Sequence, residues 1–362
     1  MGDSARLTLD LDALAANHAV LRETAAGAEV APVLKSDAYG LGAGPVARRL
    51  WAEGARTFFV ARLAEGVALR ATLGPERPAA IQVLDGFPRG AGPTLAAAGL
   101  TPALSSLPQI DAAAAFAAAQ GRRLAVTLHV DTGMNRQGLG LPEVRALAQS
   151  PDRLRGLDVD LLMSHLGSGS EPENPRNARQ LAQFLEARAL FPEARASLAA
   201  SSGIFLSPDY RFDLVRPGIS LYGGGPREIR DPRIRAVATL TAPILDIRTV
   251  APGEAIGYGE SVRVERPTRL AVVAAGYSDG VIRAAKSGGY AWFAGAQRRL
   301  LAVNMDILAI EIGDTPAAPG DEVELLGPNA LLDDLAAAAG TVAHEVLVRL
   351  SLRAERIYLG EA

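Results

Sequence analysis

Between Glu29 and Gly224 the sequence alternates short β-branched or aromatic runs with alanine-rich stretches of helical period. The run TFFVA (57–61), for example, is followed directly by RLAEGVALRATLG (62–74). Such alternation predicts parallel strands, each covered by the helix that follows it. About eight units of this kind favour a (β/α)8 barrel of the TIM type. An open, doubly wound parallel sheet is the alternative at this point.

The pattern changes after residue 230, where strand follows strand with Gly/Pro turns between them. Examples are AVATLTAPILDIRTV (236–250) and YAWFAGAQRRLLAVNMDILAIEIG (290–313). The preceding segment GGGPREIRDPRI (223–234) has the glycine, proline and charge content of a domain boundary. We therefore expect an α/β protein with two domains: a barrel over residues 1–230 and a mainly-β domain over residues 231–362.

Composition narrows the classes of partner. The 362 residues are 49% hydrophobic, which suffices for a large core, and the net charge of −3 has no lysine or arginine block behind it. The sequence therefore predicts no nucleic-acid or membrane partner and favours a small molecule. The absence of cysteine excludes disulfides, thiolate catalysis and cysteine-bound metal. No apolar stretch resembles a signal peptide or a transmembrane span, so we expect a cytoplasmic chain.

A lysine ends one of the apolar runs, in PVLKSDAYGLG (32–42). The C-terminal ends of barrel strands form the mouth of the active site, so Lys35 would direct its amine into that mouth. A lysine among apolar residues has a lowered pKa and can attack a carbonyl group. A lysine that ends a strand and reaches solvent is the alternative, and position alone leaves both open.

The segment KSDAYGLG (35–42) resembles the pyridoxal-phosphate attachment motif of alanine racemases. The resemblance continues in order along the chain through VDTGMNRQG (130–138), MSHLGSG (163–169), ASSGIF (200–205), VRPGISLYGG (215–224), IGYGES (256–261), VVAAGYSDG (272–280) and NMDI (304–307). It implies the fold type III class of pyridoxal-phosphate enzymes, in which a barrel that binds the cofactor precedes a β domain.

The resemblance also implies a set of residues for pyridoxal 5′-phosphate. Lys35 would form the covalent imine, and His165 would pack against the cofactor ring. Arg216 would face the pyridine nitrogen, and because arginine keeps its proton, that nitrogen would stay unprotonated. The phosphate would be held by Tyr39, Ser201 and the backbone amides of Gly218 and Ile219. Without the resemblance, His165 is more typical of a core residue, and Ser202 is easily confused with Ser201.

Racemisation removes a proton from one face of Cα and returns one to the other face, which two bases accomplish more easily than one. The resemblance assigns these roles to Lys35 and Tyr258. It assigns substrate contacts to Arg136, Met305 and Tyr277, and it implies a homodimer in which Tyr258, Tyr277 and Met305 enter the partner's site. The implied function is an isomerase that converts L-alanine to D-alanine and supplies D-alanine for peptidoglycan.

Three positions depart from the family pattern. His129 stands where some members have a carbamylated lysine that orients the arginine equivalent to Arg136. Ala200 replaces an asparagine, and Leu352 occupies the place of a tyrosine that reaches the phosphate in some members. We therefore expect Arg136 to be oriented by another acceptor or a small anion.

Several other functions remain as alternatives. A racemase of another small amino acid, such as serine, would share every motif named above. A pyridoxal-phosphate decarboxylase for basic amino acids has the same two-domain plan, whereas a carrier that only binds the cofactor usually lacks the β domain. A metal-dependent hydrolase would use His129, Asp131 and His165 as ligands. That hypothesis leaves Lys35 and Arg216 without a role, so we expect no metal.

Overall fold

The computed structural model describes residues 4–260, 262–350 and 353–361. By their internal contacts these residues form two compact units. The parallel-sheet unit contains His18–Ala38 and Gly42–Leu221, and the antiparallel unit contains the N-terminal segment through Asn17, Tyr39–Leu41 and Tyr222–Glu361. Helix α1 (Leu11–Ala25) contributes residues to both. The domain boundary between residues 230 and 231 stays a prediction.

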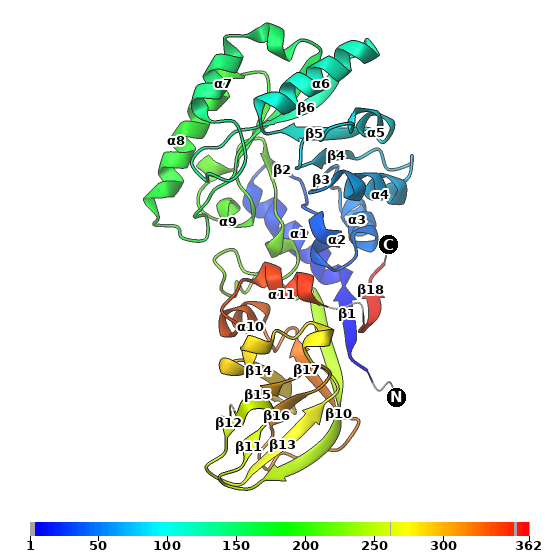
Figure 1. Cartoon of the computed structure of the whole chain (residues 1–362), viewed down its shortest axis with the longest axis vertical. Coiled ribbons are helices and arrows are strands. Elements are labelled where there is room, and N and C mark those ends of the chain that lie inside the picture. Colours follow the sequence, from blue (N-terminus) through cyan, green and yellow to red (C-terminus); the bar gives the residue numbers. More distant parts are fainter. Residues whose placement is uncertain (1–3, 261, 351–352, 362) are drawn as a thin grey trace. The chain divides into compact units, whose positions relative to one another are not determined.

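The parallel-sheet unit contains a curled sheet of six parallel strands in chain order (Figure 1). They are β3 (Thr57–Val60), β4 (Ala80–Val83), β5 (Leu100–Leu104), β6 (Leu124–His129), β7 (Leu157–Met163) and β8 (Arg195–Ser197). Strand β2 (Glu29–Val30) pairs in parallel with β9 (Leu214–Val215). Two isolated parallel bridges join Val33 to Phe59 and Ala200 to Arg216. The strand order has no reversal, so this is not the doubly wound sheet considered above.

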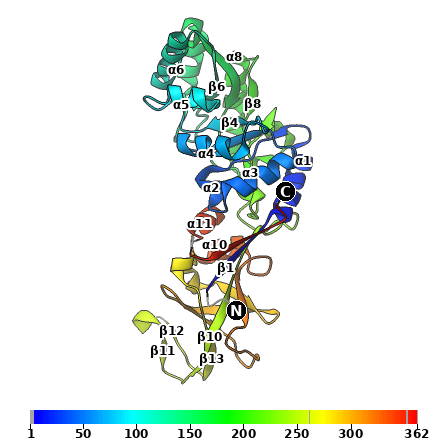
Figure 2. The same cartoon turned by 90° about the vertical axis from the view of Figure 1, so that its right-hand side faces the viewer.

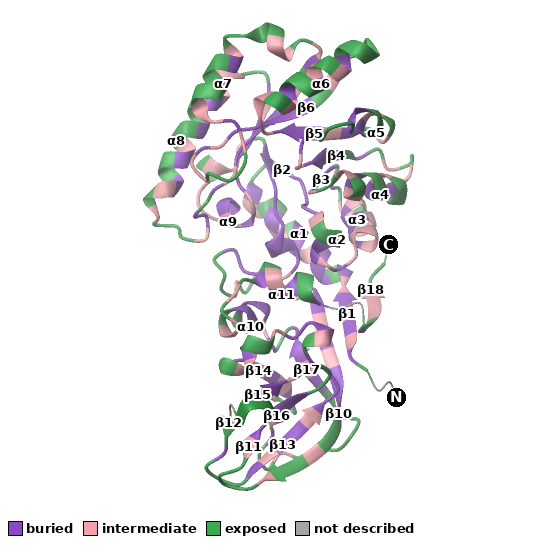
Figure 3. Ribbon diagram, viewed as in Figure 1, coloured by how far each residue is buried: buried purple, intermediate pink, exposed green. Residues whose placement is uncertain are grey.

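Helices lie around the outside of these strands in both views (Figures 1 and 2). They are α3 (Ala43–Ala52), α4 (Leu63–Leu73), α5 (Gly92–Ala97), α6 (Leu107–Gln120), α7 (Leu141–Ala148) and α8 (Pro175–Leu190), with the short α9 (Ser201–Ile204) after β8. All four residues of β3 are buried, as expected for a strand covered on both faces. Helix α8 instead buries one stripe at helical spacing, formed by Asn177, Gln180, Phe184 and Ala187. Figure 3 shows the same division between buried strands and half-exposed helices.

The antiparallel unit is a mainly-β barrel. Its sheet runs in the order β13 (Thr268–Val273), β16 (Leu308–Glu311), β15 (Ala296–Val303), β14 (Tyr290–Phe293), β17 (Glu322–Leu326), β10 (Ala238–Val250), β1 (Arg6–Asp10) and β18 (Glu355–Leu359). A further pairing of β10 with β13 closes the first six strands into a ring. The core of this ring includes Leu270, Leu301 and Ala309.

Shorter elements complete the antiparallel unit. They are the hairpin of β11 (Ala255–Ile256) and β12 (Val262–Arg263), helices α10 (Leu332–Ala338) and α11 (Ala343–Arg349), and the 3-10 turns η4 (Tyr258–Glu260), η5 (Tyr277–Asp279) and η6 (Arg283–Ser287). The parallel-sheet unit has η1 (Pro151–Leu154), η2 (Pro208–Tyr210) and η3 (Ile219–Leu221). No helix in the described part of the chain is long and apolar enough to cross a membrane.

Candidate active site

Lys35 begins a left-handed turn rather than an ordinary helix. The turn, α2 (Lys35–Tyr39), has φ of 55°, 55°, 53° and 58° at Ser36, Asp37, Ala38 and Tyr39. Left-handed backbone costs an L-residue roughly 1–2 kcal/mol, so four in succession store several kcal/mol of strain. Strain of this kind is concentrated at functional sites, where surrounding contacts hold it. No motif in the sequence indicated this turn, because none of its four strained residues is glycine.

The amine of Lys35 is partly removed from solvent and lies near a second cation, Arg136. Burial, and then the positive charge of Arg136, lower the pKa of Lys35, while Glu65 opposes them weakly. A lowered pKa increases the fraction of neutral amine, which is the nucleophilic form. These surroundings favour the nucleophile that the sequence suggested over a lysine that merely reaches solvent.

Arg216 is a buried cation held entirely by neutral acceptors. One terminal nitrogen donates to the carbonyl oxygen of Ser197 at 2.9 Å and to its hydroxyl at 2.5 Å, and the other donates to the carbonyl oxygen of Ser164 at 2.5 Å. Burial lowers the pKa of Arg216 to about 10, so it remains charged at neutral pH. Its hydrogen bonds to described residues all come from the two terminal nitrogens, so Nε–H remains as a donor to a ligand.

Two histidines lie among these cations and are neutral at pH 7. Burial, with Arg216 and Arg136 nearby, lowers the pKa of His129 to about 4. The pKa of His165 falls well below its ordinary value for the same reasons, with Lys35 contributing as well. Geometry places the two histidines together, because His129 lies opposite Met163 at the ends of β6 and β7, and Arg216 donates to the carbonyl of Ser164, the residue before His165. Such a site suits a ligand with negative charge.

The segment that carries Arg136 is shaped by one carboxylate. Asp131 Oδ1 accepts backbone N–H bonds from Gly133 and Met134, both at 2.8 Å, and from Asn135 at 3.1 Å. Arg136 is exposed at the end of this turn. The described residues contain no cluster of three His, Asp or Glu that could hold a metal ion.

The end of β8 and the residues after β9 bring together the predicted phosphate ligands of this unit. Ser201 is buried, and its Oγ accepts the N–H of Gly218 at 2.9 Å and that of Ser220 at 3.3 Å. Ile219, between them, is buried as well. The buried Oγ of Ser220 has no hydrogen-bond partner among the described residues. The amides of Gly218 and Ser220 are satisfied by Ser201 Oγ, so the unsatisfied hydroxyl of Ser220 is the donor that fits an anionic group here, and no motif in the sequence indicated it.

Tyr39 belongs to the antiparallel unit. Its ring centroid lies 4.8 Å from that of Tyr222 and 5.8 Å from that of His344. Burial raises the pKa of Tyr39, so its phenol stays protonated and can donate a hydrogen bond. No motif in the sequence indicated either ring that packs on Tyr39.

The antiparallel unit exposes the three residues that the resemblance assigns to a partner's site. Tyr258 is 76% exposed, Met305 55% and Tyr277 45%. The loops of Tyr277 and Met305 are joined, because Tyr277 N–H donates to Asn304 O at 2.9 Å and Ser278 N–H to Met305 O at 3.0 Å. Clustered large side chains exposed on one chain are typical of an interaction surface.

Comparison with known proteins identifies this arrangement. Residues 9–226 match the family model described as alanine racemase, N-terminal domain, and residues 237–358 match alanine racemase, C-terminal domain. The chain belongs to the alanine racemase family. The alanine racemase of Methylobacterium sp. (strain 4-46) is 43% identical over 98% of this chain and 98% of its own length. The catabolic alanine racemase of Mesorhizobium japonicum is 42% identical over 98% and 93%.

Solved structures that are similar to this chain are alanine racemases as well. The alanine racemase of Bartonella henselae, described as having covalently bound pyridoxal phosphate, has a TM-score of 0.93 at 35% identity, covering 99% of this chain and all of that one. The alanine racemase of Streptomyces coelicolor A3(2) has a TM-score of 0.92 at 34% identity, over 99% and 98% of the two chains. Membership of the alanine racemase family confirms the resemblance inferred from the motifs.

Of the three positions that depart from the alanine racemase pattern, the structure describes His129 and Ala200. His129 is buried and neutral, and its Nδ1 has no hydrogen-bond partner among the described residues. It therefore cannot supply the negative charge that a carbamate would place beside Arg136. Ala200 lies at the bridge to Arg216, whose backbone N–H donates to Ala199 O at 2.9 Å. Leu352 lies outside the described residues.

Proposed function

We propose that this chain uses pyridoxal 5′-phosphate to convert L-alanine to D-alanine. Its family membership and the cations gathered around Lys35 carry the proposal. The residues present fit the cofactor: a half-buried lysine of lowered pKa for its aldehyde, a buried arginine for its ring nitrogen, and the unsatisfied buried hydroxyl of Ser220 near Ser201 for its phosphate. When bound, the cofactor supplies an electron-withdrawing ring that acidifies the Cα–H of the amino acid.

The residues named by the motifs would hold this group in place. Lys35 Nζ would be its covalent attachment point, and Arg216, which keeps its own proton, would leave the ring nitrogen unprotonated. His165, neutral at pH 7, packs against the ring. Ser201 and the amides of Gly218 and Ile219 bind the phosphate. Tyr39 adds the protonated phenol as a further donor.

Two bases would then act on opposite faces of the substrate. The neutral amine of Lys35 removes or returns the Cα proton on one face, and the phenol of Tyr258 acts on the other. The guanidinium of Arg136 and the backbone N–H of Met305 hold the substrate carboxylate, and Tyr277 narrows the entrance.

We propose a homodimer as the active form. The exposure of Tyr258, Tyr277 and Met305 supports it, because a second chain would cover them. We further propose that the parallel sheet closes into an eight-stranded barrel, supported by the β2–β9 pair and the two isolated bridges. The domain boundary near residue 230 is supported by family matches that end at residue 226 and resume at residue 237.

Incubation with L-alanine in deuterated water tests the function. The proposal predicts loss of optical rotation together with deuterium at Cα, because proton removal and return proceed on both faces. Exchange without D-alanine would contradict the two-base assignment, and turnover of serine but not alanine would contradict the substrate. We also propose a cytoplasmic location and use of the product in peptidoglycan. A deletion strain that grows only with added D-alanine would support that use.

A further inference from the structure

Glu65 joins two segments of the parallel-sheet unit. It lies in the first turn of α4, where its Oε2 accepts the backbone N–H of Ala61 at 2.8 Å and that of Arg62 at 2.9 Å. Its other oxygen, Oε1, accepts the N–H of Ser36 at 2.7 Å. The contact with Arg62 is ordinary helix capping. The contact with Ser36 is not, because Ser36 precedes Glu65 by 29 residues and immediately follows Lys35.

The strained turn after Lys35 needs such a contact. Three further hydrogen bonds of the turn are local: Ala38 N–H donates to Leu34 O at 2.9 Å, Gly42 N–H to Asp37 O at 2.9 Å, and Ala43 N–H to Asp37 Oδ1 at 2.7 Å. Local bonds form in a right-handed turn as readily as in a left-handed one, so they do not select the hand. Glu65 lies on a separate element, and its carboxylate fixes the peptide group between Lys35 and Ser36 in space. This contact therefore favours the left-handed turn over a right-handed one.

We propose that Glu65 is a positioning residue that holds the left-handed turn and thereby sets the direction of the Lys35 side chain. The amide of Ser36 belongs to the same peptide group as the carbonyl of Lys35. Fixing that group restricts the backbone of Lys35, and with it the direction of its Cα–Cβ bond. This inference rests on the proposed function, because it matters only if Lys35 holds the cofactor.

The charge of Glu65 has a second effect that can be measured separately. It raises the pKa of Lys35, against the larger lowering by burial and Arg136. Removing the charge should therefore lower the pKa of the Lys35 amine further, and the pH midpoint for covalent attachment of the cofactor should fall. A purely structural cap would leave that midpoint unchanged.

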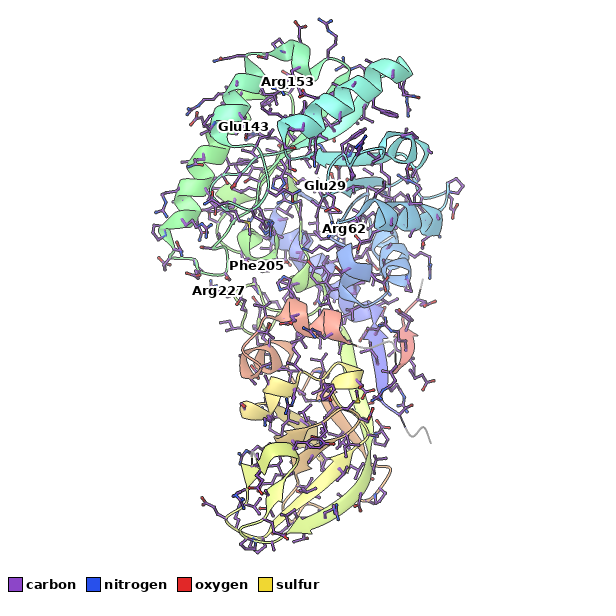
Figure 4. All side chains as sticks on the ribbon, in the orientation of Figure 1. Glu29, Arg62, Glu143, Arg153, Phe205 and Arg227 are labelled. Carbon is purple, nitrogen blue, oxygen red and sulfur yellow. The ribbon has the colours of Figure 1, made fainter. Side chains whose placement is uncertain are left out.

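The test compares Glu65→Gln with the matched control Glu143→Gln. Glu143 occupies the equivalent position in the first turn of α7, where its Oε2 accepts the N–H of Gly140 at 2.8 Å. Figure 4 labels Glu143 on α7 and Arg62 beside the start of α4. The control removes the same negative charge from the first turn of a helix, keeps one acceptor for the Gly140 N–H, and has no contact with the turn.

For Glu65→Gln we expect kcat to fall about 100-fold with KM within twofold, because misplacing a reacting group by about 1 Å costs this much. Pyridoxal 5′-phosphate should bind about tenfold more weakly in equilibrium dialysis, since its attachment point is misdirected. Glu143→Gln should match the wild type within about twofold in every measurement, as expected of a surface capping position. Equal behaviour of the two variants would overturn the inference.

A second substitution makes the test specific to the turn. Glycine adopts positive φ without the Cβ penalty, so Ser36→Gly in the Glu65→Gln background should recover about tenfold of the lost kcat. Recovery supports the inference, and no recovery contradicts it. If Glu65→Gln does not fold, hydrogen exchange in the wild-type holoenzyme decides: slow exchange at Ser36, as at Ala61, supports the contact, and exchange at the rate of an exposed loop refutes it.

Different results would refute the proposed function and the role of Glu65. Covalent cofactor in Lys35→Ala would remove the proposed function itself. Loss of cofactor in Lys35→Ala, combined with a Glu65→Gln variant identical to Glu143→Gln, would remove only the role of Glu65.

Discussion

Replacing Arg353 by methionine should destabilise the antiparallel unit. Arg353 Nε donates to Asp279 Oδ1 at 2.7 Å, one terminal nitrogen contacts Asp279 Oδ2, and the other donates to Asp306 Oδ1 at 2.5 Å. The first carboxylate belongs to the loop of Tyr277, and the second follows Met305 directly. One guanidinium therefore ties together both loops that carry proposed substrate contacts.

The size of the effect follows from burial. Asp279 is 2% exposed, and removing one partner of a buried ion pair costs about 3–5 kcal/mol. The side chain of Arg353 is 43% exposed, and Asp279 Oδ2 keeps the N–H of Gly276 at 2.8 Å, so water and that amide offset part of the loss. We therefore expect Arg353→Met to lower the free energy of unfolding by about 2–3 kcal/mol and Tm by about 5–10 °C.

Urea denaturation and scanning calorimetry measure this loss. The control is Arg248→Met, because Arg248 forms only a loose, exposed pair with Asp246 at 3.8 Å. Its loss should stay below about 0.5 kcal/mol. A double-mutant cycle with Asp279→Asn should give a coupling of about 2 kcal/mol. If Arg353→Met lost no more stability than Arg248→Met, or if the coupling were zero, the reasoning about this cluster would be refuted.

Two further substitutions test other parts of the account. Tyr258→Phe should lower kcat by about 10²–10⁴-fold while the absorbance spectrum of the bound cofactor stays unchanged, because only one proton carrier is lost; full activity would remove Tyr258 from the mechanism. His18 is buried, and burial followed by Arg22 lowers its pKa from 6.5 to about 4. In the unfolded chain His18 binds a proton as the pH falls through 6.5, whereas in the folded chain it does so only near pH 4. The contribution of His18 to the free energy of unfolding is therefore fully present above pH 6.5 and is lost as the pH falls toward 4. Between pH 6.5 and 5 the wild type should lose about 2 kcal/mol more than His18→Gln in urea denaturation, and equal losses would contradict this assignment.

Local patterns in the sequence predicted the strands and helices from Thr57 to Ser197 because burial there repeats at short range. Strand β3 is buried on both faces, and α8 buries a stripe at helical spacing. Pairings between distant segments leave no such pattern. Nothing near Arg6 indicates that β1 pairs in parallel with β18, where Arg6 lies opposite Glu355.

The family motifs predicted Lys35, Arg216 and Ser201 as site residues. The structure places all three in one unit, and their roles stay predictions. The left-handed turn was not predicted, because Ser36 and Ala38 have no intrinsic preference for positive φ that a sequence pattern could reveal. Glu65 was missed for a related reason: its position in α4 predicts an ordinary cap, and only the structure brings Ser36 to it.

The central claim, that Lys35 holds the cofactor covalently, can be measured directly because the chain contains only two lysines, Lys35 and Lys286. Protein saturated with pyridoxal 5′-phosphate would be reduced with borohydride, digested and analysed by mass spectrometry, with Lys286→Arg as the control. The account predicts one phosphopyridoxyl group, on the peptide containing Lys35, in both proteins. An unmodified Lys35 peptide, or a label on Lys286 alone, would contradict it.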